Sequence, residues 1–129
     1  MNNKEIINIV KQVQPLISKV YNTNCKVELH NNIYERLSGI DGMDGEYKPY
    51  GEYDWNYKKI YLYTNRMDSI EQIVKTLLHE TVHSTQSKKL FDYYYDIGHT
   101  YDSHPLECQA RYHEKYWKSY KINKEICII

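Results

Sequence analysis

Apolar positions recur at helical spacing in two long segments of the chain. In residues 4–21 they fall three and four positions apart, which predicts an amphipathic helix. Pro15 is expected to kink this helix or to divide it in two. Residues 68–88 carry a second stripe of the same kind, and Asp68 with Glu71 has the spacing of a capping box at a helix start.

Strict alternation of apolar and polar residues predicts strands elsewhere. Residues 59–64 give the clearest pattern, with two aliphatic side chains on one face and two tyrosines on the other. Residues 25–29 alternate in the same way, and residues 47–53 predict a short strand interrupted by Pro49 and Gly51. These segments predict a small sheet between the two helical regions.

The remaining segments complete an α+β prediction. Residues 38–46 are rich in glycine and aspartate and predict a loop, and residues 91–103 are aromatic, acidic and irregular. A last helix is expected over 105–120, because proline is favoured in the first turn and Pro105 stands there. The 129 residues are the length of one domain, so we expect a single domain over 1–129 with a twisted antiparallel or mixed sheet.

Composition narrows the classes of function. Seventeen basic residues balance seventeen acidic ones, which gives no electrostatic footprint for nucleic acid or an anionic membrane. Neither a membrane-spanning stretch nor a secretory signal is visible, so we expect a cytoplasmic protein. Three cysteines without a C-x-x-C pair argue against a disulfide framework and against a cysteine-rich zinc site.

The second helical segment contains an H-E-x-x-H motif, formed by His79, Glu80 and His83. Histidines four apart share a helix face and can bind one Zn²⁺, which lowers the pKa of its bound water to about 7. Glu80, rotated by about 100° from His79, is then placed to act as general base. Chance alone gives such a motif in roughly 2% of chains of this composition. Both histidines lie opposite the apolar stripe of the helix, so they either line a cleft that another element covers or face solvent.

A catalytic zinc needs a third protein ligand and leaves one position for water. The long metzincin motif is absent, since Gln86 and Lys89 stand where its glycine and third histidine would be. Glu107 is the leading candidate, because it falls in the first turn of the helix that Pro105 opens. The alternative is that Glu107 only favours the helix as a first-turn acid paired with Arg111 four residues on. His99 is the alternative ligand.

The spacing of these residues resembles a known group. The segments His79-Glu80-x-x-His83-x-x-Gln86 and Tyr101-x-x-x-Pro105-x-Glu107-x-x-Ala110 are similar to those of small gluzincin-type metallopeptidases of phages and bacteria, such as the peptidase domain of the phage-immunity regulators that cleave repressors. The resemblance covers roughly residues 50–111 and implies a zincin-like fold with Glu107 as third zinc ligand. It also implies a hairpin before the zinc helix, whose last strand forms the edge along which substrate lies.

Other residues are candidates for supporting roles. The following could donate to a developing oxyanion, although each is individually more typical of a structural role: Tyr101, His99 and His104. The distal nitrogens of the histidine ligands need acceptors, for which Asp96, Asp102 and Glu114 are available. An extended substrate could add to the strand formed by Ile60, Tyr61, Leu62 and Tyr63, which could equally be an ordinary sheet edge.

These observations predict a minimal zinc-dependent peptidase that hydrolyses peptide bonds in a specific protein substrate. Two alternatives remain. One is a non-enzymatic phage or bacterial interaction module that keeps the fold, against which the intact Glu80 argues. The other is a zinc amidase acting on cell-wall peptide.

Overall fold

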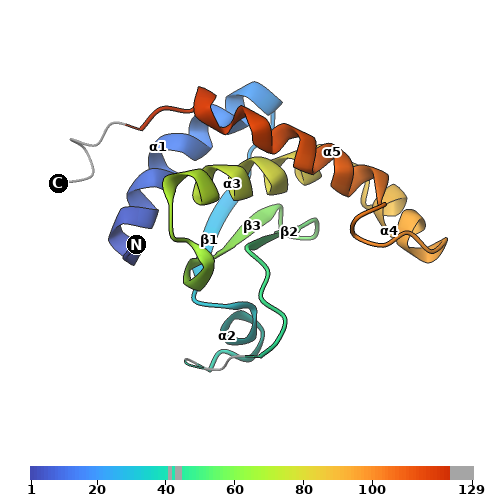
Figure 1. Cartoon of the computed structure of the whole chain (residues 1–129), viewed down its shortest axis with the longest axis horizontal. Coiled ribbons are helices and arrows are strands. Elements are labelled where there is room, and N and C mark those ends of the chain that lie inside the picture. Colours follow the sequence, from blue (N-terminus) through green and yellow to red (C-terminus); the bar gives the residue numbers. More distant parts are fainter. Residues whose placement is uncertain (41, 43–44, 123–129) are drawn as a thin grey trace.

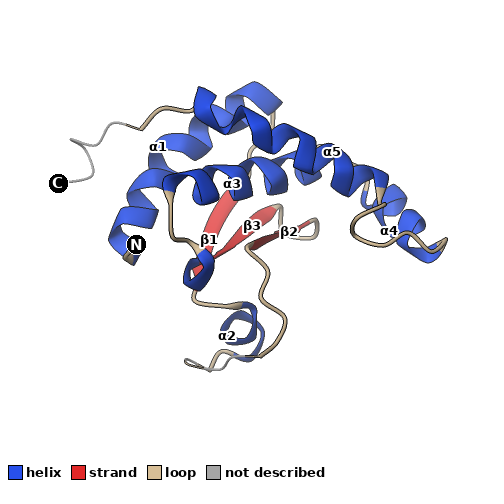
Figure 2. Cartoon of the chain, in the orientation of Figure 1, coloured by secondary structure: helices blue, strands red, loops and turns tan. Residues whose placement is uncertain are grey.

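The computed structural model describes residues 1–40, 42 and 45–122, which form an α+β arrangement (Figures 1 and 2). Five α-helices, two 3₁₀ helices and three strands are found in these residues. In chain order they are α1 (Asn3–Tyr21), β1 (Lys26–His30), α2 (Ile33–Ser38), β2 (Gly51–Asp54), β3 (Lys59–Tyr63), η1 (Thr64–Arg66), α3 (Ile70–Ser84), α4 (Lys88–Asp96), α5 (Pro105–His113) and η2 (Glu114–Ser119).

The sheet is mixed, one of the two predicted forms, but the strand expected at its edge lies in its centre. The order is β1-β3-β2, with β1 parallel and β2 antiparallel to β3. The prediction that residues 60–63 form a sheet edge is therefore wrong: Ile60, Tyr61, Leu62 and Tyr63 belong to the central strand, and neighbouring strands occupy both of its sides. The edge of the described sheet beside α3 is β2 instead.

The two faces of β3 pack as the alternation predicts. Ile60 and Leu62 are fully buried against α1 and α3, in a core completed by residues of both helices: Ile6, Ile9, Val13, Ile17, Ile73, Val74, Leu77 and Leu78. Tyr61 and Tyr63 turn to the opposite face, where they pack with Ile33. That face is covered by α2, a helix that the sequence analysis did not predict, which begins where the Asn32 side chain accepts from the backbone N–H of Glu35. Figure 1 shows α2 on the side of the sheet away from α3.

Helix α1 continues through Pro15, so the predicted alternative of two helices divided there is wrong. Pro15 is exposed, and so is Lys11, whose carbonyl would have accepted the missing N–H bond. Water can therefore satisfy that carbonyl. Val13 and Ile17, buried on the opposite side, continue the core contact across the proline.

The helix that carries the H-E-x-x-H motif is shorter than predicted. Ser69, one residue after Asp68, is its N-cap and accepts from the backbone N–H of Gln72. The helix ends at Ser84, and a new helix, α4, starts after Ser87. The prediction of irregular chain over 91–103 is thus wrong for its first six residues, which belong to α4. No residue of α4 is fully buried, so α4 has no buried apolar stripe. Its aromatic side chains attach it to the other helices instead.

The described residues also show the state of two cysteines and the character of the helices. Cys25 is buried and Cys108 exposed, both as free thiols, while Cys127 lies outside the described residues, as do residues 41, 43 and 44 of the predicted loop. None of the described helices combines the length and the apolar character that crossing a membrane requires.

Gly51 lets β2 approach α3 closely. A Cβ atom at Gly51 would lie 2.7 Å from Cγ2 of Thr76 and 2.8 Å from the carbonyl oxygen of Tyr61, with Cγ of Glu80 at 3.7 Å. Real Cβ atoms essentially never come within 3.0 Å of another heavy atom, so no other residue fits without a shift of the strand. Glycine at this position therefore sets the distance between the sheet edge and the helix of the motif.

We expect Gly51→Ala to lower the free energy of unfolding by about 1–3 kcal/mol, because the added methyl group overpacks the β2–α3 contact. Urea denaturation measures it. Adding Thr76→Ser removes Cγ2 and keeps the hydroxyl that donates to the carbonyl of Gln72, so the double variant should recover part of the loss. A Gly51→Ala variant as stable as the parent would contradict this packing.

Candidate metal centre

The residues of the H-E-x-x-H motif are buried, although they lie on the side of α3 away from the apolar core. His79, Glu80 and His83 are only 7%, 7% and 4% exposed. Helix α5 covers them: it runs along α3 (Figure 1), and its Ala110 is fully buried. The alternative that the two histidines face solvent is excluded, and the predicted cover by another element is found.

Glu107 is brought to both histidines by the first turn of α5. One carboxylate oxygen, Oε1, lies 3.0 Å from Nε2 of His79 and 2.6 Å from Nε2 of His83. Ligand atoms of the three buried residues all lie within 4.8 Å of one another. The residues predicted as ligands therefore form one group that could hold a metal ion, and Glu107 is not paired with Arg111, which donates to the carbonyls of Tyr101 and Asp102 instead.

The outer nitrogen of each histidine has its own acceptor. Nδ1 of His79 lies 2.8 Å from Oε2 of Glu114, one of the three acids considered for this role. Nδ1 of His83 lies 2.7 Å from Oε1 of Gln86. In the neutral form of each histidine these acceptors favour the proton at Nδ1, which leaves the Nε2 lone pair on the side of Glu107.

Two imidazole nitrogens and one carboxylate oxygen thus converge on one point, and a positive charge there stabilises the arrangement. A proton can supply it: burial opposes charging of His79, but Glu107 and Glu114 outweigh it and raise the pKa of His79 to about 10. Burial likewise opposes ionisation of Glu107, yet His79 and His83 lower its pKa to about 2. A divalent metal ion supplies more charge, and two imidazoles with one carboxylate are a donor set that suits Zn²⁺ and leaves a position open.

Glu80 lies between the histidines and the sheet edge and belongs to no ligand group. Its Cγ faces Gly51, and its carboxylate lines the cleft beside His79 and His83. Burial raises the pKa of Glu80, and the nearby carboxylates of Glu107 and Glu52 add to that effect, while the two histidines oppose it. A carboxylate made more basic in this way fits the predicted role of general base.

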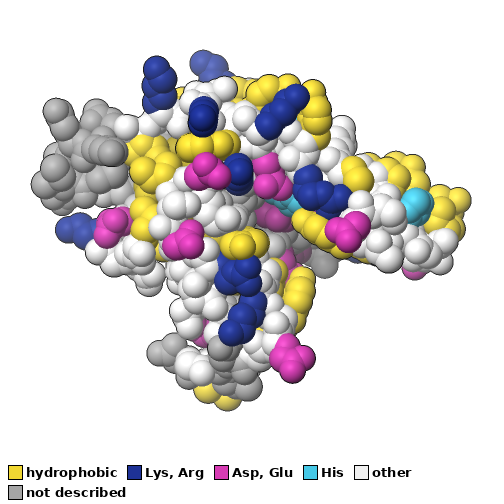
Figure 3. Space-filling model, viewed as in Figure 1, with side chains coloured by type: hydrophobic (Ala, Val, Ile, Leu, Met, Phe, Trp, Pro, Cys, Tyr) yellow, Lys and Arg dark blue, Asp and Glu magenta, His cyan; other side chains and the backbone are white. Residues whose placement is uncertain are grey.

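A cleft of about 700 Å³ opens above these residues. Its walls are largely aromatic and come from the segment before β2, from β2 and the turn after it, from α4 and from the α4–α5 connection: Tyr47, Tyr50, Tyr53, Trp55, Phe91, Tyr95 and Tyr101. In the space-filling view, histidine and acidic side chains meet in a hollow near the middle of the face, with hydrophobic side chains beside them (Figure 3). The arrangement offers room for a ligand directly over the candidate ligands.

The three residues proposed as oxyanion donors lie in different environments. Tyr101 lines the cleft, and its ring stacks on that of His79 with centroids 6.5 Å apart. His104 is fully buried and is the N-cap of α5: its Nδ1 accepts from the backbone N–H groups of Leu106 and Glu107 and its Nε2 donates to the carbonyl of Phe91. It therefore orients Glu107 and is not available as a donor to substrate.

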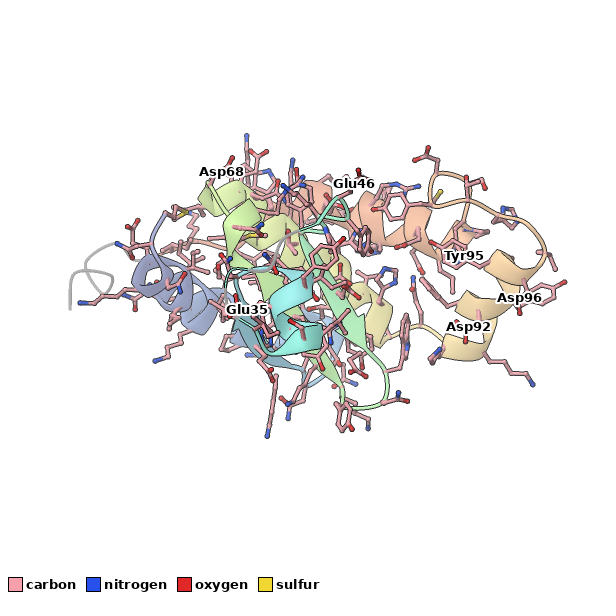
Figure 4. All side chains as sticks on the ribbon, turned by 90° about the horizontal axis from the view of Figure 1, so that it is seen from below. Glu35, Glu46, Asp68, Asp92, Tyr95 and Asp96 are labelled. Carbon is pink, nitrogen blue, oxygen red and sulfur yellow. The ribbon has the colours of Figure 1, made fainter. Side chains whose placement is uncertain are left out.

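His99, the alternative third ligand, is outside the group. Its Nδ1 pairs with Oγ of Ser103 at 3.1 Å, and its ring packs against Tyr94. Asp96 likewise does not reach the histidines; Figure 4 shows it with Asp92 on α4, whereas Tyr95 extends toward α5. The remaining acid, Asp102, offers its carbonyl to Arg111.

Residues to which the sequence analysis gave no role complete the site. Gln86 holds His83, and Tyr95 donates a long hydrogen bond, 3.3 Å, to Oε2 of Glu107. Phe91 and Trp55 pack against each other and against the ring of His83. The aromatic density of residues 91–95 was the one signal in the sequence that could have indicated this wall.

Comparisons with protein-family models, with curated proteins and with solved structures find no match to this chain. The resemblance to gluzincin-type metallopeptidases therefore stays a prediction that rests on the motif residues. The geometry of the candidate centre shows only that His79, His83 and Glu107 could hold a metal ion.

If His79, His83 and Glu107 hold zinc, removal of Glu107 should strongly weaken its binding. We expect Glu107→Ala to weaken zinc binding by more than the roughly 10–100-fold that loss of an outer hydrogen-bond partner costs. His99→Ala is the control and should bind zinc as the parent does, because His99 does not contact the group. Competition with a chromophoric chelator measures both affinities, and the reverse ranking would transfer the third-ligand role to His99.

The ion pair between His79 and Glu107 predicts that binding of zinc to this group would depend on pH. The raised pKa of His79, about 10 against an ordinary 6.5, means that its protonation stabilises the metal-free fold fully below pH 6.5 and that this stabilisation is lost as the pH rises toward 10. Zinc must displace that proton, so its affinity increases with pH. The zinc-induced rise in melting temperature should therefore be larger at about pH 8 than at about pH 6; an equal or smaller rise would contradict the proposed competition.

Proposed function

We propose that this chain is a zinc-dependent peptidase with a zincin-like arrangement, in which His79, His83 and Glu107 hold the ion and Glu80 is the general base. The observation that carries the proposal is the convergence of two Nε2 atoms and one carboxylate oxygen in a buried site, beside a further carboxylate that takes no part in the group. A closed structural site would use four protein ligands, whereas three leave a position for water.

When bound, the ion acts as a Lewis acid that makes water a nucleophile near neutral pH and polarises the scissile carbonyl. Glu80 accepts the proton of the attacking water and delivers it to the leaving amine nitrogen. Its raised pKa favours both transfers, because a base with a pKa nearer the working pH both takes and returns the proton. The largely aromatic walls of the cleft reduce the polar surroundings of this exchange.

Tyr101 is the candidate that remains for stabilising the developing oxyanion. Burial raises the pKa of its hydroxyl, Glu107 adds to this effect, and Arg111 opposes it. The hydroxyl therefore keeps its proton at neutral pH and can donate it in a hydrogen bond. Tyr101 also lies on the cleft wall next to His79.

The substrate is proposed to bind in extended form along β2. This strand is the sheet edge that borders the cleft, and Gly51, Glu52 and Tyr53 line it. The open backbone groups of an edge strand can pair with a peptide, so that the scissile bond passes over Glu80. This replaces the predicted role of β3, whose two sides are already paired.

We expect Glu80→Gln to bind zinc as tightly as the parent and to lower turnover of a cleaved peptide by about 10²–10⁴-fold, because the amide cannot accept the proton. A quenched-fluorescence peptide library and a purified peptidoglycan digest supply the substrates. A parent chain that binds zinc but cleaves no peptide would contradict the proposal. In that case, cleavage of peptidoglycan would support the zinc amidase. Full biological effect of the Glu80→Gln variant would support the interaction module.

A further inference from the structure

Gln86 stands two residues beyond the end of α3 and connects several parts of the centre. Its side-chain oxygen lies 2.7 Å from Nδ1 of His83. Its side-chain nitrogen donates to the carbonyl of Leu106 at 3.0 Å and to Oε1 of Gln109 at 2.8 Å, both on α5. Its own carbonyl accepts from the indole N–H of Trp55 at 3.3 Å.

These contacts leave the amide of Gln86 only one orientation. A backbone carbonyl can accept a hydrogen bond and cannot donate one, so the carbonyl of Leu106 requires the NH₂ group of Gln86 on its side. The amide oxygen must then face His83, and because that oxygen can only accept, the imidazole must carry its proton on Nδ1. The lone pair of His83 is therefore at Nε2, the atom that faces Glu107.

The same helix provides the other elements of the centre. Leu106, whose carbonyl orients Gln86, is the neighbour of Glu107 in the chain, and Glu114, which holds Nδ1 of His79, follows the last residue of α5 directly. One docked helix thus places the third ligand and fixes the proton position of both histidines. Before α5 docks, nothing in these contacts directs the Nε2 lone pair of His83 toward the ion.

We propose that Gln86 is a positioning residue through which the docking of α5 sets the tautomer of His83 and thereby prepares the site for the metal. The inference rests on the proposed zinc site and concerns only the side-chain amide of Gln86. The two ends of the amide have different functions: the oxygen fixes the tautomer of His83, and the nitrogen binds α5.

Two substitutions separate these ends. Gln86→Leu removes both, whereas Gln86→Glu keeps an acceptor for Nδ1 of His83 and loses the donor to α5. We expect Gln86→Leu to weaken zinc binding by about 10–100-fold, and Gln86→Glu to recover most of that loss, because a carboxylate fixes the same tautomer without help from α5. Gln109→Leu is the matched control: it removes one partner of the amide but leaves the Leu106 carbonyl, so its zinc affinity should stay within about threefold of the parent.

Zinc affinities of the full-length chain and its three variants are measured by competition with a chromophoric chelator, with circular dichroism as the check on folding. Proton NMR of the zinc-loaded proteins gives a second readout: the Nδ1 proton of His83 should be protected from exchange in the parent and in Gln86→Glu, and should exchange with solvent in Gln86→Leu. Equal zinc affinity of Gln86→Leu and the parent would overturn the inference, and so would an equal loss in Gln86→Glu and Gln86→Leu, which would indicate a merely structural residue. A parent chain that binds no zinc would overturn the proposed function together with this inference.

Discussion

The meeting of two imidazole nitrogens and one carboxylate oxygen in a buried position is the constraint around which the chain is organised. Burial of these polar groups would be costly without a cation between them. The ligand atoms of His79, His83 and Glu107 all lie close together in this buried position. The apolar stripe of α3 holds that helix on the sheet, which frees its opposite face for the histidines. Helix α5 then covers this face and contributes Glu107.

The rest of the fold shapes access to that point. Gly51 allows β2 to lie against α3 at the level of Glu80, so the sheet edge borders the candidate centre directly. Helix α4 carries no buried apolar stripe and is attached through Phe91 and Tyr95 to the rings of His83 and His104 and to Glu107. His104 in turn caps α5, so the aromatic wall of the cleft and the orientation of Glu107 depend on the same contacts.

Local sequence patterns predicted the parts of this structure that depend on spacing along one element. The four-residue interval of His79 and His83, the alternation of Ile60 with Tyr61, and Pro105 ahead of Glu107 are properties of a single helix or strand, and the structure confirms each as geometry. The position of β3 in the sheet was missed because strand order depends on β1, whose residues pair with residues 33 positions further along the chain. The contacts of Gln86 and Tyr95 with α5, and that of His104 with the carbonyl of Phe91, were missed for a similar reason, since each joins two different elements. Helix α4 was missed because aromatic contacts hold it and its sequence has no apolar stripe.

X-ray absorption at the zinc edge of the purified chain, loaded with one equivalent of the metal, tests the central claim most directly. The account predicts two imidazole nitrogens and a carboxylate oxygen at about 2.0–2.1 Å, one additional light atom from solvent and no sulfur. A sulfur scatterer at about 2.3 Å, a shell of oxygen atoms without imidazole, or failure of the chain to retain zinc would contradict it.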